Sequence, residues 1–325
     1  MKEFNMNNIK KIGLSALAGS LVAMSAHAEI SMSADASVAI GKANESLKTG
    51  YYQSDSIYFT YAGETDGGLG VTVKVELDAS ATGTLASTDS RSIALTSEGM
   101  GTLTYAGHGG DSVMGGWDDV TPNAYEEAYA GVSTDAGVAA TGAIGGKTGD
   151  GLWRYDSPSF SGVSLHASYY NDSATGSVSS YADMGIQIAP EMVEGLSLGY
   201  ATGSYDESAS VLGVDVSTLW VKYAYGPVTV GYQVSEADGP TAATDDDTTA
   251  MSISYAVSDS LSISYGEHTI DDGGWSGVDQ EATGMSASYT MGGTTISAFR
   301  NSVDNIGGTA SADEKGWEIA LSFAF

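Results

Sequence analysis

The chain has 325 residues, with 43 glycines, 19 tyrosines, only 5 prolines and no cysteine. Its formal net charge is −29, and such an acidic surface repels nucleic acid, so we expect no nucleic-acid partner. Without cysteines, an exported chain of this length must be held together by strand pairing and packing rather than by disulfide bonds.

The first 28 residues have the pattern of an export signal. Three lysines precede an apolar run over residues 12–24, which is followed by the small-residue pattern Ala26-His27-Ala28. The run is too short for a membrane-spanning helix, which needs about 20 residues. We therefore expect a cleaved signal peptide over residues 1–28 and a single domain over residues 29–325. A start at Met1 or at Met6 would leave this division unchanged.

Beyond the signal, apolar and small polar side chains alternate with a period of two residues, which is typical of strands whose two faces meet different surroundings. Turns rich in Gly, Asp and Ser separate the segments. We predict 16 strands, with apolar positions at 30–40, 57–61, 71–77, 93–95, 103–105, 153–155, 163–169, 182–188, 196–200, 219–223, 228–234, 251–257, 261–265, 285–291, 294–298 and 317–325. The even number and the apolar faces predict an all-β fold, an antiparallel transmembrane β-barrel.

The connections between these strands alternate in length. Residues 225–227 and 257–260 are tight turns, whereas 235–247 and 267–280 are longer and acidic. A barrel of the bacterial outer membrane has short periplasmic turns and longer extracellular loops, so we assign the two groups to those sides.

One connection is far longer than the others and runs from His108 to Gly151. A structureless loop of this length in a compact protein is either functional or a sign of wrong strand assignment. It carries acidic residues that could line a pore or be ordinary solvated charges: Asp111, Asp118, Asp119, Glu126, Glu127 and Asp135.

The last strand ends the chain at Phe325, with Trp317, Ile319, Leu321 and Phe323 on one face. A nearly uniform apolar face at the end of a chain must meet a core or lipid. We expect this strand to close the barrel against the first strand.

Several short motifs, in order along the chain, carry a resemblance to a known family. They are Glu29-Ile-Ser-Met-Ser33, Gly63-Glu-Thr-Asp-Gly-Gly-Leu69, Gly101-Thr-Leu-Thr-Tyr105, Arg154-Tyr-Asp-Ser-Pro158 and the terminal Phe325. The chain resembles Gram-negative general porins, in particular the alphaproteobacterial, Rhodobacter-type porins.

The resemblance implies a 16-stranded barrel, usually a homotrimer, whose third loop folds into the lumen and narrows a water-filled channel. In such porins, acidic loop residues face basic residues on the wall, and some relatives bind calcium. The terminal Phe325 resembles the signal read by the outer-membrane assembly machinery. Outer-membrane lipid and lipopolysaccharide are further expected partners.

The chain departs from the family pattern in its basic residues. Relatives carry arginines in the first two strands, where this chain has Ala36-Ser-Val38 and Ser54-Asp-Ser-Ile57. By alternation, the remaining inward-facing basic candidates are Lys74, Arg154 and Lys222. Arg91 shares the outward parity of its neighbours, and the facing of Arg300 stays open.

We therefore predict a passive channel for ions and small hydrophilic solutes that prefers cations, because residues 29–325 carry 40 acidic and 9 basic residues. The alternative is a surface barrel with a plugged lumen, acting as an adhesin or structural protein. A soluble secreted β protein is a further alternative.

We expect no enzymatic activity and no required cofactor. The histidines His108, His166 and His268 show no Ser-His-Asp arrangement in the sequence, although a barrel hydrolase stays open. Asp245, Asp246 and Asp247 offer oxygen ligands suited to calcium but lack the spacing of a dedicated calcium loop.

Overall fold

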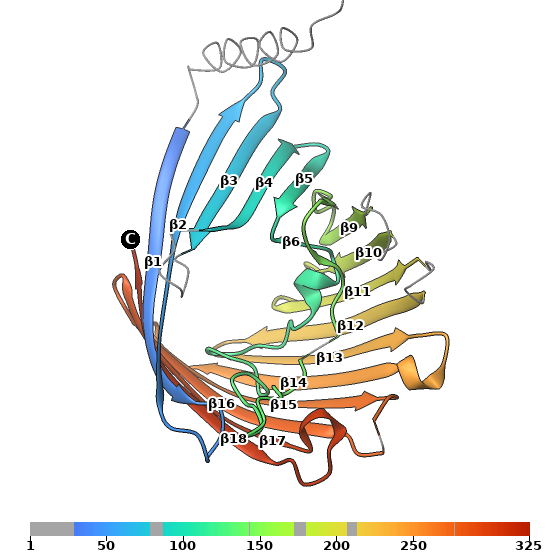
Figure 1. The fold of residues 1–325 in the computed structure, drawn as a ribbon. Coiled ribbons are helices and arrows are strands. Elements are labelled where there is room, and N and C mark those ends of the chain that lie inside the picture. The colour runs from blue at the N-terminus through green and yellow to red at the C-terminus, as the bar shows by residue number, and fades with distance from the viewer. Residues whose placement is uncertain (1–28, 79–86, 143, 172–179, 207–212, 276) are drawn as a thin grey trace, which may run out of the picture.

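The computed structural model describes residues 29–78, 87–142, 144–171, 180–206, 213–275 and 277–325. The predicted signal peptide lies outside these residues. Sixteen strands pair into one closed barrel (Figure 1), which confirms the predicted fold and strand number. Their bounds are β1 Glu29–Lys42, β2 Gly50–Glu64, β3 Gly70–Asp78, β4 Ser87–Ser97, β5 Gly101–His108, β8 Leu152–Asp156, β9 Val163–Tyr170, β10 Tyr181–Ile188, β11 Leu196–Tyr205, β12 Val214–Tyr225, β13 Val228–Asp238, β14 Asp246–Ala256, β15 Leu261–Asp272, β16 Gln280–Met291, β17 Thr294–Asp304 and β18 Glu314–Ala324.

The barrel closes where β1 meets β18. The two strands pair antiparallel from Asp35 opposite Ala324 to Lys42 opposite Trp317. Beyond the strand, the Phe325 N–H donates to the Ala34 carbonyl at 2.8 Å. The predicted closure by the last strand is therefore confirmed, and it removes the unpaired edges that an open sheet would expose.

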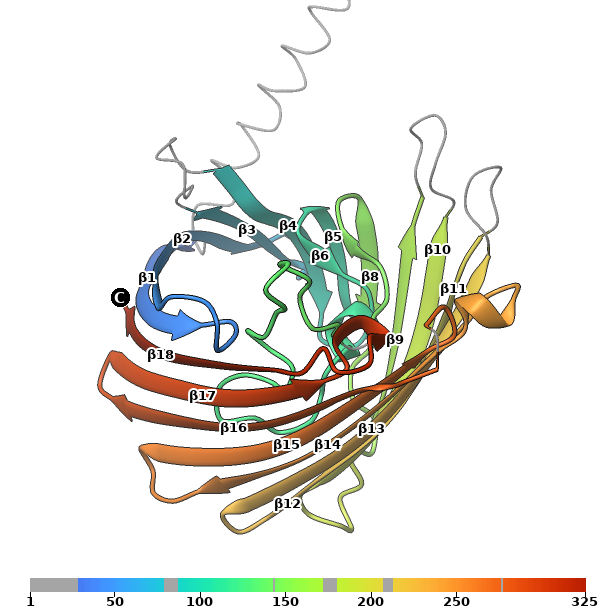
Figure 2. The same cartoon turned by 60° about the horizontal axis from the view of Figure 1, so that its bottom comes forward.

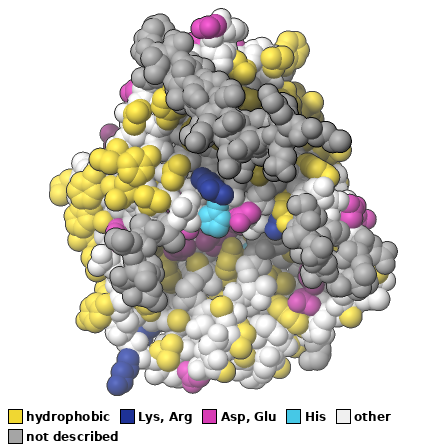
Figure 3. All heavy atoms as spheres, turned by 45° about the horizontal axis from the view of Figure 1, so that its top comes forward, with side chains coloured by type: hydrophobic (Ala, Val, Ile, Leu, Met, Phe, Trp, Pro, Cys, Tyr) yellow, Lys and Arg dark blue, Asp and Glu magenta, His cyan; other side chains and the backbone are white. Residues whose placement is uncertain are grey.

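The alternation of side chains sets the two faces of the wall. On β12, Leu219 and Val221 are exposed on the outside, whereas Trp220 between them is buried inside the barrel. Figure 3 shows hydrophobic side chains gathered over one flank of the molecule and charged side chains near the centre of the same view. An apolar outer surface on a closed barrel matches lipid, which offers the backbone no hydrogen bonds.

The two ends of the barrel differ in their connections. Residues 226–227 and 292–293 are two-residue turns at the end that holds both chain termini. At the other end, the predicted loops 235–247 and 267–280 are shorter than expected. Their acidic flanks belong to the strands, because Glu236 pairs with Asp247 and Asp246 with Asp272.

Three short 3-10 turns and one small sheet complete the fold. The turns are η1 (Gly115–Trp117), η2 (Ala242–Thr244) and η3 (Ile306–Gly308), and the small sheet pairs β6 (Gly110–Asp111) with β7 (Thr148–Gly149). Among the residues that the structure describes, no helix has the length and apolar character needed to cross a membrane.

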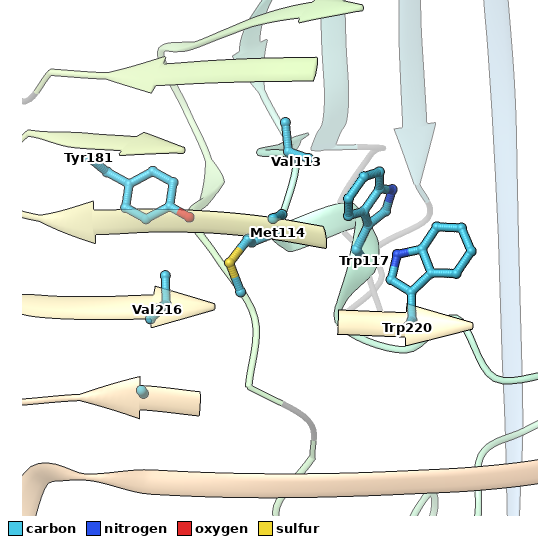
Figure 4. Packing of buried hydrophobic residues seen from close by; sticks show 8 residues of the cluster. Val113, Met114, Trp117, Tyr181, Val216 and Trp220 are labelled. Atoms are coloured by element: carbon cyan, nitrogen blue, oxygen red, sulfur yellow. The ribbon is translucent and has the colours of Figure 1, made fainter. Parts of the chain in front are cut away.

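Residues 109–142 and 144–151, between β5 and β8, lie inside the ring of strands (Figure 2). We call this segment the inner loop. Its first part packs a buried apolar cluster against the wall: Met114 and Trp117 contact Tyr181, Val216 and Trp220 (Figure 4). The rings of Trp117 and Trp220 meet edge to face at 5.5 Å, a favoured aromatic geometry.

Candidate functional site

The inner loop is fastened to the wall along much of its length by polar side chains that point inward. The contacts begin at β9, where the Val113 N–H donates to Ser168 Oγ at 2.9 Å. The Met114 N–H donates to Asp183 Oδ2 at 2.9 Å, and Arg154 Nη1 donates to the Ser112 carbonyl at 3.0 Å. These contacts satisfy loop backbone groups that burial would otherwise leave without partners.

The middle of the inner loop crosses β13 to β16 and meets one polar anchor on each strand. Gln233 accepts the Val120 N–H at 2.9 Å and donates to the Trp117 carbonyl at 2.6 Å. Further anchors, in strand order, are Ser252 to the Pro122 carbonyl, Ser264 to the Ala124 N–H and Ser286 to the Tyr125 N–H. The loop is therefore held flat against this half of the wall.

The far end of the inner loop reaches β17, β18 and the connection after β1. Asn301 Nδ2 donates to the carbonyls of Glu127 and Ala130, both at 2.8 Å. The Tyr125 hydroxyl donates to Glu318 Oε1 at 2.8 Å, and Asn44 Nδ2 donates to the Ser133 carbonyl at 3.1 Å. The loop thus follows the wall from β8 to β18.

Inward-facing glycines make room for this close approach. A Cβ on Gly284 of β16 would lie 2.7 Å from Ala128 Cα, and one on Gly231 of β13 would collide with Pro122. Glycine is required at these two places because backbone of the loop lies where a side chain would be.

Four of the predicted loop acids lie in the middle of the inner loop. Asp119 and Glu127 line one small cavity together with the buried His268 of β15. Burial raises the pKa of Asp119 to about 6, and the charges of Glu127 and Asp118 add to the rise. Burial and the charges of Glu127 and Glu318 raise the pKa of Glu126 to about 7. Burial also raises the pKa of Asp118.

The other two predicted loop acids lie at the two ends of the path that the inner loop follows along the wall. Asp111 is exposed in β6, and its carbonyl accepts a hydrogen bond from Arg154 Nη1 at 3.4 Å. Asp135 is exposed in the turn over 134–137, beyond the contact with Asn44. The structure therefore does not bring these two together with the central four.

The wall formed by β1 to β5 carries its own carboxylates on the inner face. By register, Asp35, Glu76 and Asp78 face inward, and Glu76 accepts a hydrogen bond from Ser90 Oγ at 2.8 Å. Carboxylate oxygens of Glu76, Asp78 and Asp89 lie within 4.8 Å of one another. Lys74 is the one basic residue on this inner face within the described range.

The three predicted inward-facing basic residues do face inward but have different surroundings. Lys74 is exposed between Thr60 and Ser92. Arg154 is partly buried and paired with Asp156, with its Nε 3.1 Å from Oδ1. Lys222 lies on β12, opposite Gly231, and is partly exposed.

Two arginines face outward. Arg91 pairs with the outward-facing Val75 and is exposed, as its parity predicted. Arg300 alternates with the buried Phe299 and Asn301, so it lies on the outer face of β17. Neither arginine contributes to the lumen.

The proposed calcium ligands do not converge. Asp246 faces inward beside Asp272, Asp247 faces outward, and Asp245 Oδ1 accepts the Gly239 N–H at 3.0 Å. Calcium binding there stays a prediction that this geometry does not favour.

The structure brings a Ser, a His and an Asp together that showed no such arrangement in the sequence. His166 Nδ1 lies 2.6 Å from Asp156 Oδ1, and its Nε2 lies 3.1 Å from Ser164 Oγ. Asp156 and His166 are register partners on β8 and β9, which the sequence did not reveal.

Acyl transfer would also need hydrogen-bond donors aimed at an oxyanion. Instead, the surroundings of this cluster fit a structural anchor. Asp156 is bound by Arg154, which holds the start of the inner loop, and the Trp117 ring meets His166 edge on at 5.5 Å. The other histidines do not join it: His108 Nδ1 lies 2.5 Å from Asp150 Oδ1, and His268 is buried beneath Tyr129.

A profile of the Gram-negative porins matches residues 13–325. The chain belongs to the Gram-negative porin family. This porin is an integral β-barrel of the outer membrane and forms a channel. Family and fold point to a channel rather than an enzyme.

Solved structures of porins share the fold of this porin. The anion-selective porin from Comamonas acidovorans has 12% sequence identity and a TM-score of 0.70, covering 92% of this chain and 100% of that one. A triple mutant of Rhodopseudomonas blastica porin has 18% identity and a TM-score of 0.64, covering 91% and 100%. OmpT of Vibrio cholerae in its trimer form has 13% identity and a TM-score of 0.68, covering 92% and 100%. No curated protein sequence matches the chain.

Two groups of residues in this porin were missed by sequence reasoning. Glu318, Asp35 and Glu76 bring carboxylates to the lumen, and the inward serines, Gln233 and Asn301 anchor the inner loop. The alternation of side chains shows that these residues face inward. It does not show which strands the inner loop contacts, because that depends on how the barrel closes. Their roles could not be read from local sequence.

Proposed function

We propose that this porin is a passive diffusion channel that prefers cations. The observation that carries the proposal is the presence of carboxylates on both sides of the lumen. The inner loop carries Asp118, Asp119, Glu126 and Glu127, and the facing strands β1 to β3 carry Asp35, Glu76 and Asp78. Charges lining a pore set its selectivity through their field, so cations are favoured.

The basic residues of the lumen offset these acids only in part, because the inward-facing Lys74 and Lys222 are fewer than the carboxylates. The charge of Arg154 is compensated by Asp156. Lys147 of the inner loop has its Nζ 4.5 Å from the ring centre of Tyr170. The arginine-rich wall of the relatives is replaced here by a largely acidic one, so we propose no strong transverse field.

The test is the reversal potential of single channels in a planar bilayer under a KCl gradient. We expect cation preference in the native protein. The variant Asp118→Asn/Asp119→Asn/Glu126→Gln/Glu127→Gln should lose most of it while keeping its conductance steps. Anion preference in the native protein would contradict the proposal.

A matched control removes four carboxylates of the same types from the outer face. The variant Glu236→Gln/Asp247→Asn/Glu281→Gln/Asp304→Asn changes the net charge equally, but these side chains point away from the lumen. Its selectivity should stay near native. An equal loss in both variants would show that overall charge, rather than the inner loop, sets selectivity.

The alternative function, a plugged surface barrel acting as an adhesin or structural protein, predicts no conductance steps at all. The same recording therefore separates the two. The inner loop is bound to the β8 to β18 side, which supports an open path along β1 to β5.

We propose that the porin assembles as a homotrimer, as the trimer form of OmpT does. Its proposed solutes are ions and small hydrophilic molecules, and outer-membrane lipid, including lipopolysaccharide, surrounds it. Phe325 would serve as the signal for the outer-membrane assembly machinery. Deleting Phe325 should then lower the amount of assembled barrel more than the conductance of each assembled channel.

A further inference from the structure

A cleft lies between the inner loop and the wall, close to the loop end of the barrel. Its volume is about 400 Å³, which is in the range of small-molecule sites. Strands β11 to β15 line it on the wall side, and residues 141–142 and 144–145 of the inner loop line it on the other side. We call this space the loop cleft.

The loop cleft stays open because the inner loop is fastened to the wall on both sides of it. On one side, the Thr141 N–H donates to Gln280 Oε1 of β16 and the Thr141 carbonyl accepts from Gln280 Nε2, both at 3.0 Å. On the other side, Gly146 packs so closely against Tyr181 of β10 that a Cβ would lie 2.5 Å from the hydroxyl oxygen. Of the described residues between these two points, none forms a hydrogen bond with the wall.

The wall of the loop cleft is apolar. Val216 of β12, Ala237 of β13 and Ile270 of β15 line it, and all three face inward. Deeper in the barrel, the inward positions of the same strands include polar anchors of the inner loop, such as Gln233 and Ser264. The cleft therefore offers an apolar surface where the rest of the covered wall offers hydrogen bonds, and such a surface suits an apolar body.

Three polar side chains complete the lining of the loop cleft. Asp246 and Asp272 are register partners on β14 and β15 and both face inward. Asp272 Oδ1 accepts the Gly274 N–H at 2.7 Å, but neither carboxylate forms an ion pair with a basic residue in the part of the chain that the structure describes. Thr248 is only 5% exposed, and among the described residues its hydroxyl has no hydrogen-bond partner.

These polar groups lack a cation that donates hydrogen bonds. Carboxylates directly opposite one another on neighbouring strands repel, and a buried hydroxyl without a partner costs free energy. An ammonium group relieves both costs, because it carries a positive charge and three N–H donors for carboxylate and hydroxyl oxygens. A hydrated metal ion would gain nothing from the apolar wall, whereas an organic cation also has an apolar body to place there.

We propose that the loop cleft binds a small organic cation, an ammonium group attached to an apolar body. The ammonium group lies between Asp246, Asp272 and Thr248, and the apolar body packs against Val216 and Ile270. This inference goes beyond the proposed ion preference, because it names a class of solute that the wall holds through its own carboxylates rather than through the acids at the centre of the inner loop.

The test compares two double variants that lose the same charges. Asp246→Asn/Asp272→Asn neutralises the carboxylates of the loop cleft. Asp215→Asn/Asp238→Asn neutralises another pair of register partners near the loop end, on β12 and β13, whose side chains point outward. Both variants remove a repulsion between opposed carboxylates, so both should fold.

Binding is measured by isothermal titration calorimetry on the purified barrels in one detergent. The probe is 2-phenylethylammonium. Methylammonium, which has the charge without the large apolar body, and 2-phenylethanol, which has the body without the charge, are the matched probes. Partition of each probe into detergent is the same for every variant and is subtracted from a titration of detergent alone.

We expect 2-phenylethylammonium to bind Asp246→Asn/Asp272→Asn at least about tenfold more weakly than the native protein, since two charged acceptors are lost. The outward variant should bind it as the native protein does. Methylammonium and 2-phenylethanol should each bind the native protein at least about tenfold more weakly than 2-phenylethylammonium does. Ala237→Val should also weaken binding of 2-phenylethylammonium, because the added methyl groups occupy the cleft without changing the charge.

Four outcomes would overturn the proposal. They are no binding of 2-phenylethylammonium to the native protein, native binding by Asp246→Asn/Asp272→Asn, equal losses in the two double variants, and equal binding of 2-phenylethylammonium and either matched probe. Calorimetry needs no current through the channel. Reversal potentials recorded on the same samples therefore keep a failure of this proposal separate from a failure of the proposed ion preference.

Discussion

The inner surface of the barrel has two halves that share one sequence pattern but perform different tasks. From β8 to β18, small inward residues such as Ser264 and Ser286 are buried and hold the inner loop. From β1 to β5, the inward residues face the lumen, and Asp35 and Glu76 place charge there. Alternation decides which residues face inward, but contact with the loop decides whether an inward residue is an anchor or a pore-lining group.

This division has a physical cause. A loop laid against a wall buries its own N–H and C=O groups, and each needs a partner. Hydroxyl and amide side chains supply partners without bringing charge, whereas carboxylates without partners are stable only where water reaches them. Anchors are therefore mostly neutral. Most of the lumen charge lies on the surface of the inner loop and on β1 to β5, the part of the wall that the loop leaves uncovered, which we call the bare half.

The largest expected effect comes from removing two neighbouring anchors. Ser264→Ala/Ser286→Ala leaves the Ala124 and Tyr125 N–H groups without acceptors, which should cost roughly 2–4 kcal/mol in the free energy of unfolding. The middle of the inner loop should loosen, and single-channel conductance should become larger and noisier. Planar-bilayer recording and urea unfolding measure both effects.

The control for this variant is a second pair of inward serines. Ser288→Ala/Ser297→Ala removes two serines that contact each other at 3.4 Å and, among the described residues, form no hydrogen bond with the inner loop. Ser264 and Ser286 also contact each other, at 2.7 Å, so the two variants lose similar side-chain contacts. Equal channel noise in both would show that the serines do not hold the loop.

The next effect in size tests the close approach of the inner loop. Gly284→Ala places a Cβ against Asn301 Oδ1 and 2.7 Å from Ala128 Cα. Because Asn301 binds the loop at Glu127 and Ala130, relieving this overlap should cost about 1–3 kcal/mol and push the loop into the lumen. Conductance should fall. Urea unfolding and bilayer recording measure the two quantities.

Gly266→Ala is the matched control, because Gly266 is the register partner of Gly284 on β15. Its added Cβ would lie 3.4 Å from the nearest atom, Ser252 Cβ, and 3.8 Å from Ala128 Cβ, which are ordinary contacts. The control should conduct as native. If it lowers conductance as much as Gly284→Ala, close packing of the loop at Gly284 is not the cause.

A smaller effect is expected from the bare half. Asp35→Asn/Glu76→Gln should lower the cation-to-anion permeability ratio by about twofold, since charges facing water act through a high dielectric and contribute at most ~1 kcal/mol. The reversal potential in a KCl gradient measures this. Asp247→Asn/Glu281→Gln, an outward pair of the same composition, should leave the ratio unchanged; no difference between the two variants would mean that β1 to β3 do not line the ion path.

Much of the fold could be predicted from the sequence, because the period of two is a local property. The 16 strands, the closing β18 and the inward parity of Lys74, Arg154 and Lys222 all followed from it. Contacts across the barrel did not, because Ser264 and Ala124 are 140 residues apart. For the same reason, the Asp156-His166 pair and the role of Glu318 emerged only when the strands were placed side by side. The acidic ends of β13 and β15 were assigned to loops because acidic segments are typical of loops, whereas the structure pairs these carboxylates across neighbouring strands.

The last prediction separates the two halves by pH. Burial raises the pKa of Asp119 to about 6 and that of Glu126 to about 7, with Asp118, Glu127 and Glu318 adding negative charge around them. Lowering the pH from 8 to 5 should protonate these two groups and remove two negative charges from the inner loop. Cation preference should therefore fall as the pH falls, with the change centred between about pH 6 and 7. The variant Asp119→Asn/Glu126→Gln should start with weaker cation preference and lose most of this pH dependence, whereas Asp35→Asn/Glu76→Gln should keep it. Reversal potentials at each pH measure the change, and a pH dependence that persists in the Asp119→Asn/Glu126→Gln variant would place the titrating groups outside the inner loop.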